Sequence, residues 1–228
     1  MLLRELQKLL DRIYDTEVGL DVYDFLVTDR GEVADGDESG ERPAPDEELL
    51  LSEDGDTVNV ALYVAPQVLE RLSAHDPMQT LDANNIADYW TALEGVSHFQ
   101  YLIWNAHRDQ SVSRHELEMQ AEVDKYAATL FLLGSQNSGR FPLRLHRWLF
   151  EQARVDESLG PEHRHLYESA NRYAARFCRM LEQRFLRRGR VRIEAMMREL
   201  RRFYRLPHAP KIRHIEATRA GSSLERRA

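Results

Sequence analysis

The chain has 228 residues, of which 43% are hydrophobic and 30% are charged, and its formal net charge is −7 at pH 7. This composition excludes fibrous, collagen-like and wholly disordered proteins, and the length allows a sizeable hydrophobic core without disulfides or a structural metal. A single cysteine, Cys178, lies within a helical pattern and is expected to be a buried thiol rather than a nucleophile.

Residues 1–10 combine leucines at helical spacing with charged side chains. They lack the apolar run and the small-residue cleavage site of a signal peptide. No other segment reaches the roughly 18 uninterrupted apolar residues that a membrane-spanning helix needs. The sequence therefore predicts a cytoplasmic protein without a membrane partner.

The N-terminal part mixes one helix with strand-like segments. Apolar residues at three- and four-residue intervals predict a helix over residues 2–13. Residues 20–29 alternate like a strand, and residues 49–51 and 57–64 flank an Asp-Gly turn that predicts a β-hairpin. Residues 30–46 are rich in Gly, Pro, Asp and Glu, so we expect a mobile acidic loop there.

The remainder of the chain is predicted to be helical. A Ser113/Glu116 capping box marks one helix start, and proline and glycine mark several boundaries. Helices are expected at residues 66–72, from Asp82 or Asn84 through Trp104, and at residues 113–133, 143–153, 161–188 and 192–204.

These elements predict a mostly helical α+β fold with a small antiparallel sheet packed on a helix pair. We expect an α+β domain over residues 1–135 and a helical C-terminal domain over residues 136–206. Pro207 and Pro210 are expected to end the last of these helices, and residues 207–228 to form a flexible tail.

Two pairs of residues carry the best candidate for a chemical site. Glu94 and His98 are four residues apart on one helix and therefore share a face, as do Glu118 and Glu122 on the next helix. The short connection favours antiparallel helices, so we expect the two pairs to face each other. One imidazole and three carboxylates suit one divalent transition metal, and zinc is the first expectation. A bound ion is expected because carboxylates buried without a cation are costly.

An alternative needs no metal. Arg108, Arg114 and Lys125 are close enough in sequence to form ordinary ion pairs with these glutamates on a solvated helix face. A carboxylate-bridged di-metal site is disfavoured, because that chemistry uses Glu-x-x-His pairs on two helices and this region supplies only His98.

The segment Glu122-Val-Asp-Lys-Tyr-Ala-Ala-Thr-Leu-Phe-Leu-Leu133 resembles the Glu-Ala-Asn/Asp-x-Phe-Ala-x-x-Leu-Leu helix of the ImmA/IrrE-type metallopeptidases. The order of elements over residues 1–135 is also similar to that family. The resemblance implies a zincin-like fold, one zinc ion and, for active members, cleavage of transcriptional repressors.

The chain departs from that family at its catalytic motif, His-Glu-x-x-His, in which two histidines hold zinc and the glutamate activates water. Placing His98 at the second histidine puts Glu94 at the first and Gly95 at the glutamate. We therefore expect a diverged, non-proteolytic protein that acts as a regulatory or partner-binding module. The alternatives are an active metal-dependent hydrolase that uses Glu118 or Glu122 as its base, and a metal-free protein or nucleic-acid interaction protein.

Arginines crowd the region from Arg184 to Arg205, with Phe203 and Tyr204 among them. Such a region can neutralise nucleic-acid phosphates, or it can pair with the acidic residues 32–56 or with another protein. The acidic total charge argues against a dedicated nucleic-acid binder. The expected partner is another protein, bound through the C-terminal helices.

Overall fold

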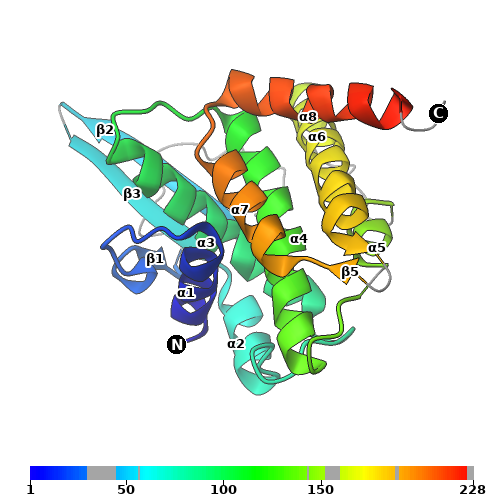
Figure 1. The fold of residues 1–228 in the computed structure, drawn as a ribbon. Helices are drawn as coiled ribbons and strands as arrows, with labels where there is room; N and C mark the ends of the chain where they lie inside the picture. Colours follow the sequence, from blue (N-terminus) through cyan, green and yellow to red (C-terminus); the bar gives the residue numbers. More distant parts are fainter. Residues whose placement is uncertain (30–44, 56, 143, 152–159, 188–189, 225–228) are drawn as a thin grey trace. The chain divides into compact units, whose positions relative to one another are not determined.

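The computed structural model describes the chain except for residues 30–44, 56, 143, 152–159, 188–189 and 225–228 (Figure 1). Its described part contains eight α-helices, a three-stranded sheet and a two-stranded sheet, which confirms the mostly helical α+β class. The predicted acidic loop lies outside the described residues as far as residue 44. Among the residues that are described, no helix has both the length and the apolar character needed to cross a membrane.

The chain divides into two compact units. Unit 1 comprises Met1–Arg12 and Thr16–Gln110, and unit 2 comprises Ile13–Asp15 and Ser111–Ala228. This division falls earlier than the domain boundary expected at residue 135. The physical reason is that α4 (Arg114–Gln136) packs along α6 (Pro161–Phe185), so α4 joins the C-terminal helices (Figure 1).

Unit 1 contains the larger sheet and the helices that follow it. Its elements are α1 (Leu2–Tyr14, with its last turn in unit 2), the 3-10 helix η1 (Val22–Asp24), β1 (Leu26–Val27), β2 (Glu47–Asp54), β3 (Thr57–Val64), α2 (Pro66–Ala74) and α3 (Ile86–Ala106). Gly55, in the turn between β2 and β3, has a φ of +60°, which explains why the Asp-Gly signal located the hairpin.

The strand order is β1-β3-β2, and the sheet is mixed. β2 pairs antiparallel with β3 from Glu47 opposite Val64 to Asp54 opposite Thr57, whereas β1 pairs parallel with β3. The expectation of a purely antiparallel sheet was therefore wrong for β1. The connection from β1 to β2 is long, so no tight turn forces these two strands into a hairpin.

α3 packs on β2 and β3, as predicted for the helix that carries Glu94 (Figure 1). Its apolar side chains at helical spacing are buried, among them Tyr89, Leu93, Val96 and Phe99. The Phe99 ring lies 4.9 Å from the ring of Phe25, which precedes β1. The burial of this helix explains why polar residues on it require a physical account.

Unit 2 is built around α4 and α6. Its other elements are α5 (Leu145–Glu151), β4 (Leu186–Arg187), β5 (Arg190–Val191), α7 (Ile193–Tyr204) and α8 (His208–Leu224). Ser113 Oγ accepts a hydrogen bond from Glu116 N at 3.2 Å, which confirms the predicted cap of α4. Cys178 is fully buried, and burial raises the pKa of its thiol well above the ordinary value, as expected for a core thiol.

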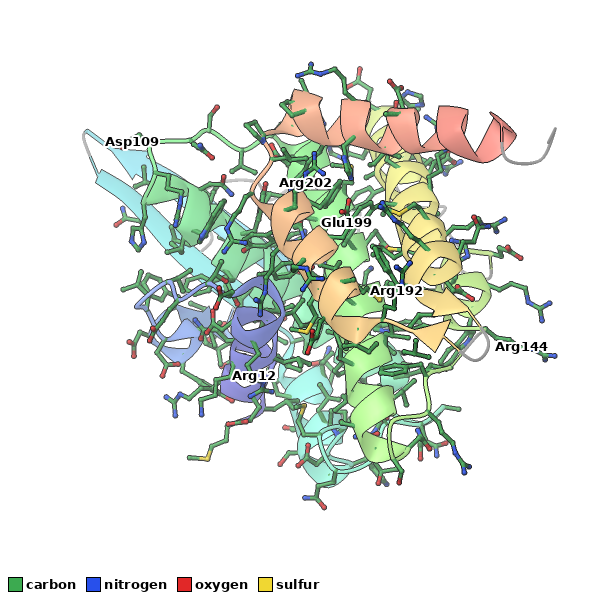
Figure 2. All side chains as sticks on the ribbon, viewed as in Figure 1. Arg12, Asp109, Arg144, Arg192, Glu199 and Arg202 are labelled. Atoms are coloured by element: carbon green, nitrogen blue, oxygen red, sulfur yellow. The ribbon has the colours of Figure 1, made fainter. Side chains whose placement is uncertain are left out.

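Helix α8 replaces the flexible tail that we expected over residues 207–228. Lys211 and Ile215 are buried, and His214 Nε2 lies 2.6 Å from Oε1 of Glu199, which is labelled on α7 in Figure 2. Pro210 is tolerated because it sits in the first turn, where its missing N–H has no helical acceptor. The two prolines thus wrongly predicted a flexible tail, because tertiary packing stabilises a helix in this segment.

Candidate metal centre

Glu94 and His98 lie one turn apart on α3 within unit 1. His98 is only 6% exposed, Glu94 is half-buried, and their nearest ligand atoms lie within 4.8 Å of each other. The predicted i, i+4 pairing of these two side chains is therefore present in the structure. A carboxylate and an imidazole placed together on an apolar helix can supply two of the ligands of a transition-metal site.

Glu47, the first residue of β2, adds a third side chain that sequence reasoning missed. Its side chain is 16% exposed, and Oε1 lies 3.9 Å from His98 Nδ1. The sequence pattern predicted this strand only from Leu49, and no motif connects residue 47 with residue 98. The contact follows from strand register and from the packing of α3 on β2, which local patterns do not encode. We call Glu47, Glu94 and His98 the α3 cluster.

Gly95 lies directly against this glutamate. A Cβ atom added at Gly95 would lie 2.9 Å from Glu47 Oε2 and 2.9 Å from Leu62 Cδ1. Both distances are too short for an unmoved neighbour. The glycine therefore allows α3 to approach β2 and β3 closely, with the Glu47 carboxylate in the space that a side chain at position 95 would enter.

Glu118 and Glu122 lie on α4 in unit 2, where each has a basic neighbour. Arg114 Nε is 3.7 Å from Glu118 Oε1, and Lys125 Nζ is 2.6 Å from Glu122 Oε1. These are the ion pairs that the metal-free alternative anticipated. Because Glu94 and His98 belong to the other unit, the convergence of the two pairs stays a prediction.

A buried polar network occupies the core of unit 2. Lys211 is fully buried, and its Nζ donates to Gln120 Oε1 at 2.7 Å and lies 3.8 Å from Glu116 Oε1. Asp124 Oδ1 accepts from Gln120 Nε2 at 2.7 Å and also from the Tyr14 hydroxyl. We call these five residues the Lys211 network.

Burial lowers the pKa of Lys211 to about 7, although the charges of Glu116 and Asp124 act in the opposite direction. Burial, followed by the charge of Asp124, raises the pKa of Tyr14 well above its ordinary value. The Lys211 network thus contains a buried lysine with a lowered pKa beside two carboxylates. No sequence pattern predicts this network, because Lys211 falls in the expected tail and Tyr14 in an ordinary helix.

A second imidazole contact in unit 2 was also missed. His115 Nδ1 lies 2.9 Å from His208 Nε2, and His115 Nε2 lies 3.2 Å from Ser169 Oγ. Burial, then His208 and Arg172, lowers the pKa of His115, which favours the neutral ring. A neutral His115 can accept the serine proton at one nitrogen and donate to His208 from the other.

Several arginines of the basic region bind groups of unit 2. Arg201 Nε donates to the carbonyl of Ile13 at 3.0 Å, and Arg205 Nη2 donates to the carbonyl of Asp15 at 3.0 Å. Arg192 and Arg202, labelled in Figure 2, are exposed. The region is therefore divided between internal hydrogen bonds and an exposed basic surface.

Comparisons of this chain with protein-family models, with curated proteins and with solved structures find no match. What this chain can do is therefore inferred from the geometry of the α3 cluster and from the chemistry of its side chains. An imidazole and two carboxylates fit the donor set of zinc, iron or manganese.

Proposed function

We propose that residues 1–135 form a diverged, zincin-like module of the ImmA/IrrE type, and that this module binds one divalent transition metal, zinc being the first expectation, through Glu94 and His98. The observation that supports it is the placement of these ligand atoms within 4.8 Å on a helix whose other inward-facing residues are mainly apolar. Burying a carboxylate there is costly unless a positive charge compensates. A bound metal supplies that charge.

The donor set fits such an ion. His98 offers a neutral nitrogen and Glu94 a carboxylate oxygen, and both must lose their protons to ligate. When bound, the metal would supply Lewis-acid chemistry at this face of α3. Further ligands from Glu118 or Glu122 remain the expectation from the sequence alone.

We propose a regulatory or partner-binding role rather than proteolysis. A zinc peptidase needs a carboxylate that takes a proton from the bound water, and such assistance contributes roughly 10²–10⁴ in rate. Gly95 offers no such group, and Glu122 is engaged with Lys125 at 2.6 Å. The partner would be another protein, bound through the C-terminal helices of unit 2.

A metal-free interaction protein is the second candidate. The exposed arginines of α7, Arg198 and Arg202, favour it, because they present positive charge that an acidic protein surface or a phosphate backbone can bind. Salt dependence of binding to DNA, RNA and acidic proteins would separate these partner classes.

Isothermal titration of the full chain with zinc tests the metal proposal. The wild type is expected to bind one equivalent, and His98→Gln is expected to lose that binding. His75→Gln is the matched control, because His75 is an exposed histidine of the same unit. Absence of binding by the wild type, or unchanged binding by His98→Gln, would contradict the proposal.

A peptidase assay tests the non-proteolytic role. The zinc-loaded wild type is expected to leave general substrates and candidate repressors intact. Robust cleavage that disappears in Glu118→Gln or Glu122→Gln would contradict this expectation and identify a base on α4. Gly95→Glu with Glu94→His rebuilds the family motif, but the new side chain meets Glu47 and Leu62, so Glu47→Ala must accompany it.

A further inference from the structure

We propose that Glu47 is a positioning residue of the metal site. In this arrangement its carboxylate accepts the Nδ1 proton of His98, which leaves Nε2 as the nitrogen that binds the metal. This inference rests on the metal site proposed above for Glu94 and His98. It also assigns a role to Gly95, which is to admit the Glu47 carboxylate to the face of α3.

The first step is the geometry of the contact. Glu47 Oε1 faces Nδ1 of His98 at 3.9 Å, and the two side chains are 16% and 8% exposed. This distance is within ion-pair range, and the proposed hydrogen bond requires the carboxylate to approach the ring by about 1 Å. Because water is largely excluded from both side chains, their mutual orientation is energetically important.

The second step is the tautomer of the imidazole. A histidine ligand is neutral and carries its single proton on the nitrogen that does not bind the metal. A carboxylate that accepts this proton fixes the tautomer and the ring orientation and makes the ligating nitrogen more basic. Since Glu47 faces Nδ1, the structure assigns coordination to Nε2.

The third step is the backbone that holds Glu47 in place. Its position in β2 is opposite Val64 in the antiparallel register, and the adjacent Asp46 carbonyl accepts a hydrogen bond from Ala65 N at 2.8 Å. The end of the β2–β3 ladder therefore fixes the residue beside α3. A positioning residue on a strand is held more precisely than one on a loop.

The fourth step concerns Gly95. The atoms that its missing Cβ would meet at 2.9 Å are the ends of two flexible side chains, Glu47 Oε2 and Leu62 Cδ1. Alanine at this position would therefore displace the carboxylate rather than the backbone of α3. Gly95→Ala becomes a way to move Glu47 away from His98 without removing it.

Nitrogen-15 NMR of the histidine rings tests the contact in the metal-free protein. The wild type is expected to show the Nδ1–H tautomer for His98, and Glu47→Ala is expected to lose that preference. An Nε2–H tautomer in the wild type would overturn the inference. This readout is independent of metal, so it separates failure of the positioning role from failure of the proposed metal site.

Zinc affinity of the same proteins tests the consequence. Glu47→Ala and Gly95→Ala are expected to weaken zinc binding by about 10–100-fold, as for other residues that orient metal ligands. Glu47→Gln should retain most of the affinity, because its amide oxygen still accepts the Nδ1 proton. Glu48→Ala, from the adjacent position of β2, is the matched control and should bind like the wild type.

Three results would overturn the positioning role. Unchanged affinity in both Glu47→Ala and Gly95→Ala, with a wild type that binds zinc, would show that Glu47 does not act on the site. Equal loss in Glu47→Gln and Glu47→Ala would show that the charged carboxylate is itself a ligand. A wild type that binds no zinc would overturn the proposed metal site, and with it any positioning role there. Circular dichroism of every variant verifies that the fold is retained.

Discussion

In unit 2 the buried carboxylates surround a lysine, whereas the α3 cluster of unit 1 combines carboxylates with an imidazole. The ammonium group of Lys211 lies 2.7 Å from Gln120 Oε1 and 3.8 Å from Glu116 Oε1. In the α3 cluster, Glu47 Oε1 lies 3.9 Å from His98 Nδ1. Both regions bury carboxylates, but in the first the chain itself supplies a lysine hydrogen-bonded to its neighbours, whereas in the second it supplies an imidazole.

This difference separates a structural role from a binding role. A network with its own lysine and several short hydrogen bonds stabilises one arrangement of α4, α8 and the last turn of α1. A cluster of carboxylate and imidazole groups gains most from a cation that arrives from solution. We therefore expect substitutions in the Lys211 network to change stability, and substitutions in the α3 cluster to change metal binding.

The largest expected effect is in the Lys211 network. Asp124→Ala removes the acceptor of the Tyr14 hydroxyl and the Gln120 amide, and it leaves Lys211 with less negative charge nearby. Breaking a buried charged network in this way costs about 3–5 kcal/mol of unfolding free energy. Guanidinium unfolding followed by circular dichroism measures it.

Glu168→Ala is the control for that experiment, because Glu168 is exposed on α6 of the same unit. Its unfolding free energy should stay within about 0.5 kcal/mol of the wild type. If Asp124→Ala changed the unfolding free energy as little as Glu168→Ala, the Lys211 network would not stabilise the fold as this comparison requires.

The second effect is stabilisation by added metal. Zinc at about 100 times its dissociation constant should raise the unfolding free energy of the wild type by about 2.7 kcal/mol, because the ion binds the folded state. Asp124→Ala should retain this increment and His98→Gln should lack it. An increment that persists in His98→Gln would place the zinc outside the α3 cluster.

The third effect is the pH dependence of unfolding that Lys211 contributes. Its pKa falls from 10.5 to about 7 on folding, so between these values the unfolded chain holds a proton that the folded chain has released. Stability from this group therefore rises as pH rises through this window, by up to about 1.4 kcal/mol per pH unit. Lys211→Met should show a flatter rise between pH 7.5 and 8.5, and an identical slope would contradict the assignment.

Local signals in the sequence predicted most of the elements of the fold. Helical spacing and the Ser113 cap located α1 and α4, and the Asp-Gly turn located the β2–β3 hairpin. The parallel pairing of β1 and the helical nature of α8 were not predictable in this way. Both depend on contacts between segments far apart in sequence, such as that of Glu199 with His214 in the folded unit.

The candidate site also combines residues that local sequence patterns predict with residues that only tertiary contacts bring together. Glu94 and His98 could be paired from sequence, because i, i+4 spacing on one helix is a local property. Glu47 and Lys211 could not, because strand register brings Glu47 to α3 and tertiary packing brings Lys211 to α4. The sequence shows Gly95 only as a missing base, because its closeness to Glu47 depends on how α3 packs against β2.

The central claim is that Glu94 and His98 hold a metal ion, and metal stoichiometry tests it most directly. Native mass spectrometry of the full chain, after exposure to zinc and removal of the excess, gives the number of bound ions. We predict one zinc per chain in the wild type and in Asp124→Ala, and none in His98→Gln or Glu94→Ala. A wild type without zinc, or one zinc retained in both α3 variants, would contradict the account.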